Sequence, residues 1–312
     1  MEAIKKDPIT PAVNSNKNTI NTSNQVHNII DGKKIAQEIY DEIKDEVIAL
    51  EGKPTMAAIL VWDSPSSKVY IAQKEKWAQY TGINFQLTKL EEKIKEEELI
   101  REIERLNTDE NINCYIVQLP LPKHISENNI IQAIDPRKDI DGFHPVNQGN
   151  IVVWDYSLFV PCTPGGIMEI FKRKNIELKW KIVTVIGTSN IVWKPIANLL
   201  TNAHATVTSC NSKTSKEFLK ARTKESDIIV VAAGVPKLLT ANMIGEKTVI
   251  IDVWITRMED GSLSGDADFD NIVSQGNLIT PVPGWVWRLT VAMLMQNTLK
   301  AYKAQNKKNL LQ

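Results

Sequence analysis

The stretch Val185-Ile-Gly-Thr-Ser-Asn-Ile-Val-Trp193-Lys-Pro195 decides the fold of this chain. An apolar run over 181–186 ends at Gly187, polar residues follow, and a helical pattern opens at about Ile191. A strand, a tight turn and a helix N-terminus in this order bind a dinucleotide phosphate, because free backbone N–H groups and the helix dipole favour an anion. Such a turn needs another small residue close behind its first glycine, yet Trp193 stands there.

Tryptophan recurs at turn sites along the chain. A single tryptophan is ordinarily a core or interface aromatic, but this chain has eight, and at least six of them stand at turn sites. Besides Trp193, Trp62 and Trp254 stand where a strand ends in a loop. Trp180 stands in a turn before a strand, and Trp285 and Trp287 stand in a Pro/Gly loop. A core role for each of them explains this distribution poorly.

The glycine content points to a different explanation. Glycine accounts for 14 of the 312 residues, against a usual share of roughly 7%. Adding the eight tryptophans restores that share. We therefore predict that most or all of these tryptophans are glycines in the cell. A genome that reads UGA as glycine, translated with a table that reads UGA as tryptophan, produces this pattern.

Length and composition restrict the function classes. A chain of 312 residues is long enough for two domains with sizeable cores. Lys+Arg and Asp+Glu are both 37, so charge gives no reason to expect nucleic acid or an anionic membrane as partner. Three widely separated cysteines (Cys114, Cys162, Cys210) indicate a reducing compartment, and the four histidines have no metal-ligand spacing. Without a long apolar run or a signal-peptide pattern, the chain is expected in the cytoplasm.

The order of predicted elements indicates two α/β units. Residues 1–28 are rich in Asn, Thr, Ser and Lys, which predicts a disordered tail. Strands and helices then alternate, which is typical of mainly parallel sheets. In the first unit a helix to about residue 50 precedes strand 56–61, helix 66–81, strand 83–88, helix 95–106, strand 114–118, helix 126–134 and a loop over 139–145. The second comprises helix 164–174, strand 181–186, helix 191–202, strand 205–209, helix 215–222, strand 227–232, short helix 240–244, strand 248–253, strand 278–280 and helix 290–304. We expect a cleft between the units, the second of which is Rossmann-like.

Four polar residues are candidates for chemistry. Tyr70 and Lys74 share one face of helix 66–81, and a desolvated lysine can act as a base while a phenol relays a proton. A solvated helix face explains this pair equally simply. Gln118 ends an apolar strand, where open α/β sheets bind ligands, and Asp141 lies in a loop. A strand-capping amide and an ordinary loop turn remain the plain alternatives for these two.

Together these segments are far more specific. Over roughly residues 29–304 the chain resembles the bifunctional methylenetetrahydrofolate dehydrogenase/methenyltetrahydrofolate cyclohydrolase family. The resemblance is carried by long, correctly spaced segments: Ser66-Ser-Lys-Val-Tyr70-Ile-Ala-Gln-Lys74, Val117-Gln-Leu-Pro-Leu-Pro122, Asp135-Pro-Arg-Lys-Asp-Ile-Asp-Gly142, Pro161-Cys-Thr-Pro-Gly165, Gly187-Thr-Ser-Asn-Ile-Val192, Ile251-Asp-Val253, Thr280-Pro-Val-Pro-Gly284 and Thr290-Val-Ala-Met293. The resemblance implies a folate-binding catalytic domain over 29–160, completed by a C-terminal helix at 288–306, and a Rossmann-like NAD(P)-binding domain over 161–287.

The resemblance also implies an activity and roles for residues. NADP⁺, or NAD⁺, would accept a hydride from 5,10-methylenetetrahydrofolate, and water would then convert the methenyl product to 10-formyltetrahydrofolate in the same cleft. Lys74 would be the catalytic lysine, tuned by Gln118, with Tyr70 beside it and Asp141 on the pterin ring. Further folate contacts are implied for Val117, Leu119, Pro283 and Gly284, and cofactor contacts for Gly187, Thr188, Ser189, Ser212 and Ile255. A homodimer joined through the cofactor domain is also implied.

Some residues depart from the family pattern. The tryptophans fall where the family carries glycine, clearly at six sites, with Trp154 a weaker match and Trp77 the weakest. Read as indoles, Trp193, Trp285 and Trp287 would block the phosphate and folate sites. Two departures have no such explanation: Thr188 replaces an arginine of some members, and Arg288 replaces a common proline. Two alternatives to the working enzyme therefore remain: a scaffold or binding protein with genuine tryptophans, and an enzyme that retains one activity.

Overall fold

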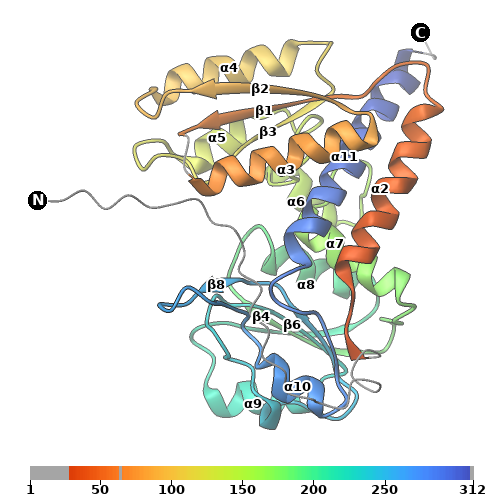
Figure 1. Ribbon diagram of the computed structural model, residues 1–312, viewed down its shortest axis with the longest axis vertical. Coiled ribbons are helices and arrows are strands. Elements are labelled where there is room, and N and C mark those ends of the chain that lie inside the picture. The colour runs from red at the N-terminus through yellow and green to blue at the C-terminus, as the bar shows by residue number, and fades with distance from the viewer. Residues whose placement is uncertain (1–27, 63–64, 310–312) are drawn as a thin grey trace, which may run out of the picture.

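The computed structural model describes residues 28–62 and 65–309, so nearly all of the tail expected at 1–28 lies outside the described residues. Two parallel sheets lie one above the other, each flanked by helices (Figure 1). This arrangement confirms the predicted α/β class with two units. Within the described residues, no helix has the length and apolar character needed to cross a membrane.

The first unit contains a three-stranded parallel sheet in the order β2-β1-β3. The central strand is buried along its whole length and is apolar on both faces, as parallel sheets require. Alternate side chains Ala57, Ile59 and Val61 pack on α4 and α5, whereas Met56, Ala58 and Leu60 face α2 and the last helix. The elements are α2 (Gly32–Ile48), β1 (Thr55–Val61), α3 (Pro65–Thr81), β2 (Asn84–Leu90), α4 (Glu96–Thr108), β3 (Cys114–Val117), α5 (Glu127–Ala133) and α6 (Pro145–Val152).

The second unit contains a five-stranded parallel sheet in the order β10-β7-β6-β4-β5. Strand β4 lies between β5 and β6, with Gly187 paired to Ala232 at its carboxyl end. Apolar residues of this sheet pack on α8 on one face and on α9 and α10 on the other. The elements are α7 (Cys162–Arg173), β4 (Ile182–Gly187), α8 (Trp193–Asn202), β5 (Thr206–Cys210), α9 (Lys216–Glu225), β6 (Ile228–Ala232), the 3-10 helix η2 (Ala241–Met243), β7 (Val249–Asp252), β8 (Thr256–Arg257), β9 (Leu263–Ser264), α10 (Phe269–Ser274) and β10 (Leu278–Ile279).

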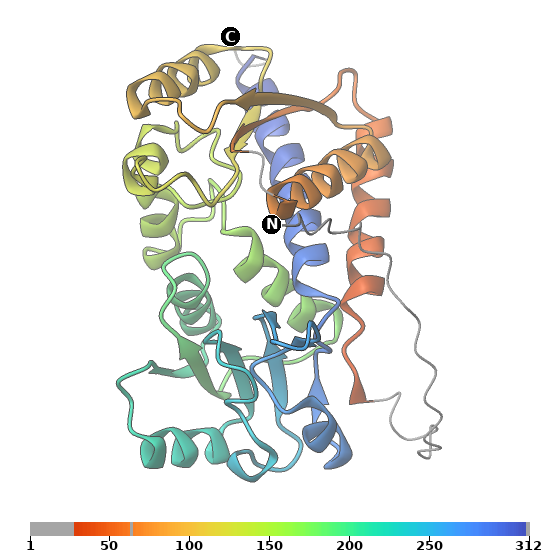
Figure 2. The same ribbon diagram turned by 60° about the vertical axis from the view of Figure 1, so that its left-hand side comes forward.

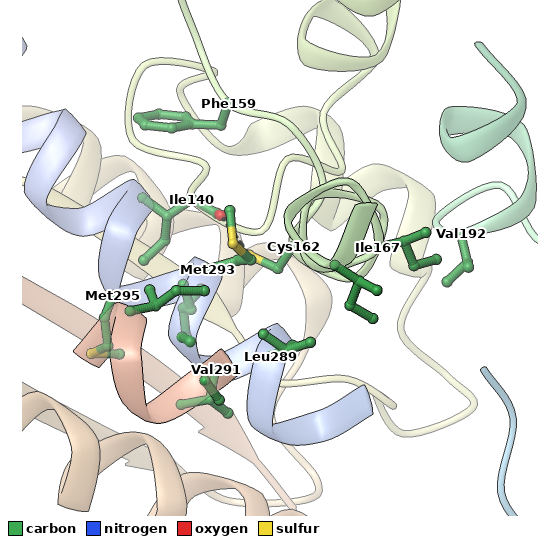
Figure 3. Packing of buried hydrophobic residues seen from close by; sticks show 14 of the residues in the cluster. Ile140, Phe159, Cys162, Ile167, Val192, Leu289, Val291, Met293 and Met295 are labelled. Carbon is green, nitrogen blue, oxygen red and sulfur yellow. Dashed lines mark hydrogen bonds between the residues drawn. The ribbon is translucent and has the colours of Figure 1, made fainter. Parts of the chain in front are cut away.

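A final helix, α11 (Val286–Asn309), joins the two units. It packs on α2 and α7 and runs from the edge of the second unit alongside the first sheet (Figures 1 and 2). One hydrophobic cluster extends from Met56 and Leu60 of the first sheet through α7 and α11 to Val183 and Val230 of the second. Figure 3 shows its middle, where Cys162 and Ile167 of α7 lie close to Leu289 and Met293 of α11. The two units therefore share a continuous core.

Helix and strand positions agree with the sequence analysis except where an element is short. Helix α6 was not expected and begins at Pro145, the last residue of the segment expected as a loop. It begins there because Pro145 opens it and the His144 ring accepts a hydrogen bond from the backbone N–H of Val146. The long helix α11 also begins earlier than expected, at Val286 rather than near Thr290. Helix α10 and the β8–β9 hairpin were not expected. Short elements of this kind have too few residues for a clear hydrophobic period.

One tryptophan occupies a position at a helix end that usually belongs to glycine. After α6, the Asp155 N–H bonds to the Asn150 carbonyl at 2.8 Å and the Trp154 N–H to the Ile151 carbonyl at 3.2 Å. This pair of bonds is the Schellman motif, whose residue after the helix adopts a left-handed backbone. Trp154 has φ of 63°. A side chain at such an angle is strained, and glycine avoids that strain because it has no Cβ.

Two further tryptophans have a left-handed backbone. Trp180 has φ of 69° in the turn that the Lys181 N–H closes on the Leu178 carbonyl at 3.1 Å. A positive φ at the third residue alone is the type II turn, in which glycine is favoured. Trp62, directly after β1, has φ of 75°. Of the seven non-glycine residues with positive φ in the described ranges, three are thus tryptophans.

Replacing one of these tryptophans by glycine tests the backbone strain. Trp180→Gly should raise the free energy of unfolding by about 1 kcal/mol, because a left-handed backbone costs a side-chain-bearing residue about that much. The indole is 80% exposed, so its removal sacrifices little packing. Trp180→Ala is the control, since it removes the indole but keeps the Cβ. Urea unfolding measures both variants, and an equal gain for alanine and glycine would contradict the strain argument.

Candidate active site

A cavity of about 350 Å³ lies between the two units, next to the carboxyl ends of their strands. Gln118 follows β3 on one side, and Val253 to Ile255 follow β7 on the other. Ligands of open α/β sheets bind at the carboxyl ends of the strands. Helix α3 and the first two turns of α11 complete the wall. The predicted cleft between the units is therefore present.

The centre of the cavity is a lysine–amide pair. Lys74 Nζ donates a hydrogen bond to Gln118 Oε1 at 2.9 Å. The Gln118 amide is oriented by its own Nε2, which donates to the Leu119 carbonyl at 2.6 Å, and its backbone N–H bonds to the Ile59 carbonyl. Tyr70 lies one turn before Lys74 on α3, and both side chains line the cavity. The sequence placed Tyr70 and Lys74 on one helix and Gln118 at the end of a strand, and the fold brings the two elements together.

Burial changes the proton affinity of both charged groups in the cavity. It lowers the pKa of Lys74, although the charges of Asp141 and Cys162 oppose the change. It raises the pKa of Asp141 to about 6, and the nearby Lys74 limits that rise. Both shifts have the same physical cause, because a low-dielectric surrounding disfavours a charged form. A lysine with a lowered pKa can lose its proton near neutral pH and act as a base.

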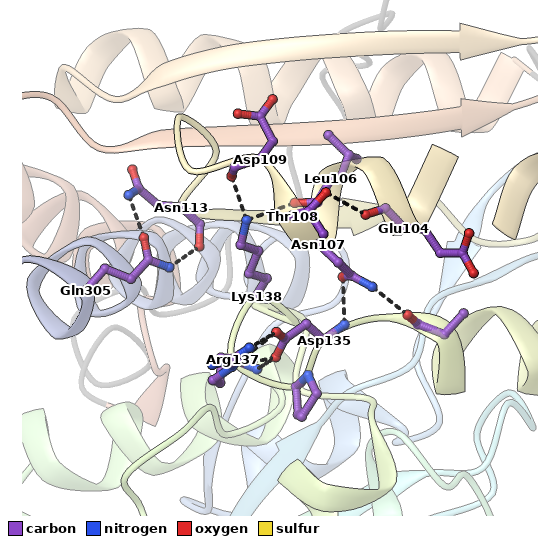
Figure 4. A network of polar contacts seen from close by, with 12 residues as sticks. Glu104, Leu106, Asn107, Thr108, Asp109, Asn113, Asp135, Arg137, Lys138 and Gln305 are labelled. Atoms are coloured by element: carbon purple, nitrogen blue, oxygen red, sulfur yellow. Dashed lines mark hydrogen bonds and ion pairs between the residues drawn. The ribbon is translucent and has the colours of Figure 1, made fainter. Parts of the chain in front are cut away.

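The loop that carries Asp141 is held by buried polar contacts on its upstream side. Lys138 Nζ donates to the Leu106 carbonyl at 2.8 Å and to the Asp109 carbonyl at 2.7 Å, as Figure 4 shows. The buried Asp139 carboxylate accepts from the His144 N–H at 2.7 Å and from Asn147 Nδ2 at 2.8 Å. Such contacts satisfy groups that would otherwise be costly to bury.

Glycine gives the same loop its shape on the downstream side. Gly142 has φ of 73°, and a Cβ there would lie 2.7 Å from the backbone nitrogen of Pro161. Only glycine permits this approach. The backbone before α7 therefore packs directly on the residue that follows Asp141.

The turn after β4 has the geometry that a dinucleotide phosphate needs. Gly187 has φ of 154°, and a Cβ there would lie 2.6 Å from the Ala232 carbonyl oxygen. Thr188 and Ser189 follow it, and α8 begins at Trp193, so the positive end of a helix dipole lies beside the turn. The Lys194 N–H bonds to the Ser189 carbonyl at 3.1 Å, and Pro195 has no N–H, so the dipole rather than a set of free donors favours an anion here. These residues fit a dinucleotide, but Trp193 Cδ1 would lie only 3.2 Å from a Gly187 Cβ, so the indole crowds the turn.

The family comparisons agree with this geometry. The model of the tetrahydrofolate dehydrogenase/cyclohydrolase catalytic domain matches residues 30–141, and that of the NAD(P)-binding domain of the same family matches residues 161–306. The bifunctional protein FolD of Nautilia profundicola is 47% identical over 278 residues, which cover 88% of this chain and 97% of that protein. FolD of Bacillus cereus strain ZK is 46% identical, with 88% and 96% covered. This chain belongs to the tetrahydrofolate dehydrogenase/cyclohydrolase family.

Solved structures of the family have the same fold. The bifunctional FolD enzyme of Campylobacter jejuni matches with a TM-score of 0.86 and 40% identity, covering 89% of this chain and 99% of that one. The Trypanosoma brucei FolD enzyme, described as complexed with NADP cofactor and inhibitor, matches with a TM-score of 0.83 and 35% identity, covering 89% and 97%. The expected membership in this family is thereby confirmed.

The fold gathers six of the thirteen expected site residues in the cavity, and Gly187, Thr188 and Ser189 lie in the turn after β4. Six line the cavity: Tyr70, Lys74, Gln118, Leu119, Asp141 and Ile255. Val117 is buried in β3 and lines a small recess behind the cavity. Pro283 and Gly284 precede α11, and Ser212 lies in the exposed loop after β5; none of these three is among the residues that line the cavity.

The tryptophans also differ in their placement. Trp287 and Trp254 line the cavity, as a blocked folate site would require. Trp285 does not, because its side chain is only 1% exposed and its Nε1 donates to the Asp252 carbonyl at 2.8 Å. It packs against Gly32 in the shared core. The expectation that Trp285 narrows the folate site therefore does not match its position.

The sequence analysis assigned no role to much of the cavity wall. Phe143 comes from the Asp141 loop, and Thr163 from the start of α7, where its hydroxyl bonds that of Thr290 at 2.9 Å. Both threonines lie in segments that carried the family resemblance, which is the signal that would have found them. The remaining unassigned lining residues are Ile191, Val192, Val253, Val286 and Val291. In the described parts of the chain, no cluster of three or more His, Cys, Asp or Glu side chains is arranged to hold a metal ion.

The raised pKa of Asp141 predicts a stability change on its replacement. In the unfolded chain the carboxyl has a pKa of about 3.9, and in the folded protein about 6. The folded state therefore holds the proton more tightly, and stability falls as pH rises from about 4 to about 6. Asp141→Asn removes this cost and should stabilise the protein by about 1 to 2 kcal/mol at pH 8 but little near pH 4.

Urea unfolding at the two pH values tests this expectation. The control is Asp155→Asn, because Asp155 is an exposed carboxylate whose pKa is lowered by bonds from Ser157. That variant should show no gain at pH 8. An Asp141→Asn effect that is the same at both pH values would contradict the assigned proton affinity.

Proposed function

We propose that this protein is a bifunctional one-carbon folate enzyme. It oxidises 5,10-methylenetetrahydrofolate to 5,10-methenyltetrahydrofolate with NADP⁺ and hydrolyses the product to 10-formyltetrahydrofolate. The observation that carries the proposal is the Lys74–Gln118 pair at 2.9 Å in a cavity that it shares with Asp141, between a family catalytic domain and a dinucleotide turn. Both activities are those in the family name, and the Trypanosoma brucei relative is described with NADP.

We assign the two units different ligands. Residues 29–160, completed by 288–306 of the last helix, bind the folate, and residues 161–287 bind NADP⁺. The strand ends support this division. In the first unit Gln118 directly follows β3, and in the second unit β4 ends at the Gly187 turn. NAD⁺ remains the alternative cofactor, because Thr188 replaces an arginine of some members, and arginine is the stronger binder of the 2′-phosphate that distinguishes NADP⁺. Lys213, in the loop after β5, would supply a positive charge for that phosphate instead.

The expected location and assembly are part of the same proposal. We propose a cytoplasmic protein that forms a homodimer through the cofactor unit. The three cysteines are buried and free, which supports a reducing compartment. Strand β5 forms an edge of the second sheet and, among the described residues, pairs with β4 on one side only, which supports an interface at that edge. Light scattering in solution tests the dimer, and a monomer mass at micromolar concentration would contradict it.

The site residues act by binding, orientation and proton transfer. When bound, NADP⁺ supplies the hydride acceptor for the methylene carbon of the folate. Asp141 holds the pterin by hydrogen bonds, and Tyr70 lines the ring pocket. Burial lowers the pKa of Lys74, and in its neutral form Lys74 takes the proton that a water loses as its oxygen bonds the methenyl carbon. As the bond from that carbon to N5 breaks, Lys74 returns the proton to N5, and the hydroxyl proton leaves to solvent.

Two other readings remain, and a specific observation favours the first of them. The indoles of Trp254 and Trp287 line the cavity and reduce the space for a folate. If these tryptophans are genuine, the protein is an impaired family member with a binding or scaffold role. The other reading retains a single activity. Against the first stands the intact set Tyr70, Lys74, Gln118 and Asp141 in one cavity.

We propose, further, that the tryptophans are glycines in the natural polypeptide. The backbone supports this at Trp62, Trp154 and Trp180, each of which has a positive φ. The surroundings support it at Trp193, which crowds Gly187, and at Trp254, whose Nε1 lies 3.2 Å from the Cβ position of Gly234.

The other tryptophans give weaker or opposite support. Trp287 is the second indole of the cavity wall, so glycine there would widen the folate site. Trp77 stacks on Tyr40 with ring centroids 3.8 Å apart, and Trp285 is fully packed and hydrogen-bonded. Packing alone would accept indoles at these last two sites.

The identity of these residues has a direct test. The coding DNA should carry UGA at the eight positions, and the mass of the natural polypeptide should match glycine. A chain made with glycine at all eight sites should show NADP⁺-dependent formation of methenyltetrahydrofolate by absorbance, at a rate above that of the tryptophan chain. UGG codons, or indole-containing peptides in the mass spectrum, would refute the reassignment.

The roles of the lysine and amide predict a split between the two activities. Lys74→Ala should abolish cyclohydrolase activity and leave measurable hydride transfer, because only hydrolysis needs the base. Lys76→Ala is the matched control, since Lys76 is exposed on the same helix and lies over the Trp77 ring. Both activities are followed by methenyl absorbance, with and without NADP⁺. Equal, complete loss of both in Lys74→Ala would contradict the separate roles.

A further inference from the structure

A buried amide on α11 contacts the segment that carries Asp141. Asn297 is 7% exposed, and its Nδ2 donates to the Ile140 carbonyl at 2.8 Å and to the Val160 carbonyl at 3.2 Å. The Cys162 thiol donates to the same Ile140 carbonyl at 3.3 Å. Asn297 Nδ2 also lies 3.6 Å from Cys162 Sγ. One side chain thus connects three separate segments.

These contacts fix the backbone on both sides of Asp141. Ile140 directly precedes it, and its carbonyl receives two donors. Gly142 follows it and packs on Pro161, next to the second carbonyl that Asn297 holds. Figure 3 shows Ile140 and Cys162 close together beside α11. The position of the carboxylate therefore depends on a residue that is not itself among those that line the cavity.

The helix places Asn297 in register with the cavity wall. Thr290 of α11 lines the cavity and bonds Thr163 at 2.9 Å. Asn297 follows seven residues, nearly two turns, later, so the two side chains lie on one face of the helix. That face contacts the start of α7 twice, through Thr163 and through Cys162. Helix α11 consequently holds the Asp141 loop in a fixed position relative to the part of the cavity wall that α11 forms with Thr290.

We propose that Asn297 is a positioning residue for Asp141 in folate binding. The inference rests on the proposed role of Asp141 as the pterin ligand. Asn297 acts through the Ile140 carbonyl and touches neither substrate nor cofactor. Without its donor, the carbonyl keeps only the weaker thiol bond, and the carboxylate loses its fixed distance to the pterin and to Lys74.

A structural role alone would give a different result from a positioning role. Gln305 provides the comparison, because it lies further along α11 and its Nε2 donates to the Asn113 carbonyl at 2.7 Å, remote from the cavity (Figure 4). Loss of either amide removes a bond between α11 and the first unit. Only Asn297 is expected to change folate affinity while the KM for NADP⁺ stays constant.

The test combines Asn297→Ala, Gln305→Ala, Asp141→Ala and the double variant of Asn297 and Asp141. Each is made in the full chain, with the residues that the natural polypeptide carries at the eight tryptophan sites. Tetrahydrofolate affinity is measured by isothermal titration calorimetry, together with both activities. We expect Asn297→Ala to weaken folate binding by about tenfold or more, and Gln305→Ala to leave it unchanged. The double variant should bind no more weakly than Asp141→Ala, because Asn297 acts through Asp141.

The outcomes separate the inference from the proposed function. An unchanged folate affinity in Asn297→Ala, or additive losses in the double variant, overturns the positioning role while wild-type turnover upholds the function. Equal losses in Asn297→Ala and Gln305→Ala overturn it too, since they report general destabilisation. If the wild-type protein neither binds tetrahydrofolate nor turns over methylenetetrahydrofolate, the function fails and the inference fails with it.

Discussion

The packing of α11 on α2, α7 and the first sheet is the contact on which the rest of the structure depends. Its apolar face belongs to the cluster that reaches Met56 in the first unit and Val183 in the second. Burial of apolar surface is the main favourable term in folding, so this helix fixes the relative position of the two sheets. The cavity exists because their carboxyl ends are held opposite each other, and α11 closes one wall with Val286 and Thr290.

A second constraint follows from placing charged groups in that enclosed space. Lys74 and Asp141 lose much of their hydration. This lowers the pKa of Lys74 and raises the pKa of Asp141, so the neutral form of each group is favoured. The protein compensates with neutral polar partners rather than with a tight ion pair, since Gln118 accepts from the lysine. An amide leaves the lysine free to exchange its proton, which a carboxylate partner would prevent by stabilising the cation. Function and stability therefore oppose each other at this site.

The sequence predicted the features that depend on neighbouring residues. The apolar run in β1 and the Gly187 turn are local patterns, so both units and their order followed from them. The site was predictable only through the family resemblance, because the 2.9 Å contact between Lys74 and Gln118 joins elements 44 residues apart. Asn297 and Phe143 were missed because their roles depend on tertiary packing. The burial of Trp285 was missed for the same reason, since the Pro/Gly loop around it suggests exposure.

The left-handed tryptophans have a consequence beyond this molecule. A misassigned codon changes the side chain in the translated sequence but not the backbone conformation that the fold requires at that position. The error therefore appears as a dihedral angle that is rare for the assigned residue. Trp154, at a helix terminus shaped for glycine, has such an angle. If UGA encodes glycine in this genome, its other proteins will concentrate tryptophan at positive φ as well. A survey of backbone angles across the proteome would then reveal the genetic code without any nucleotide sequence.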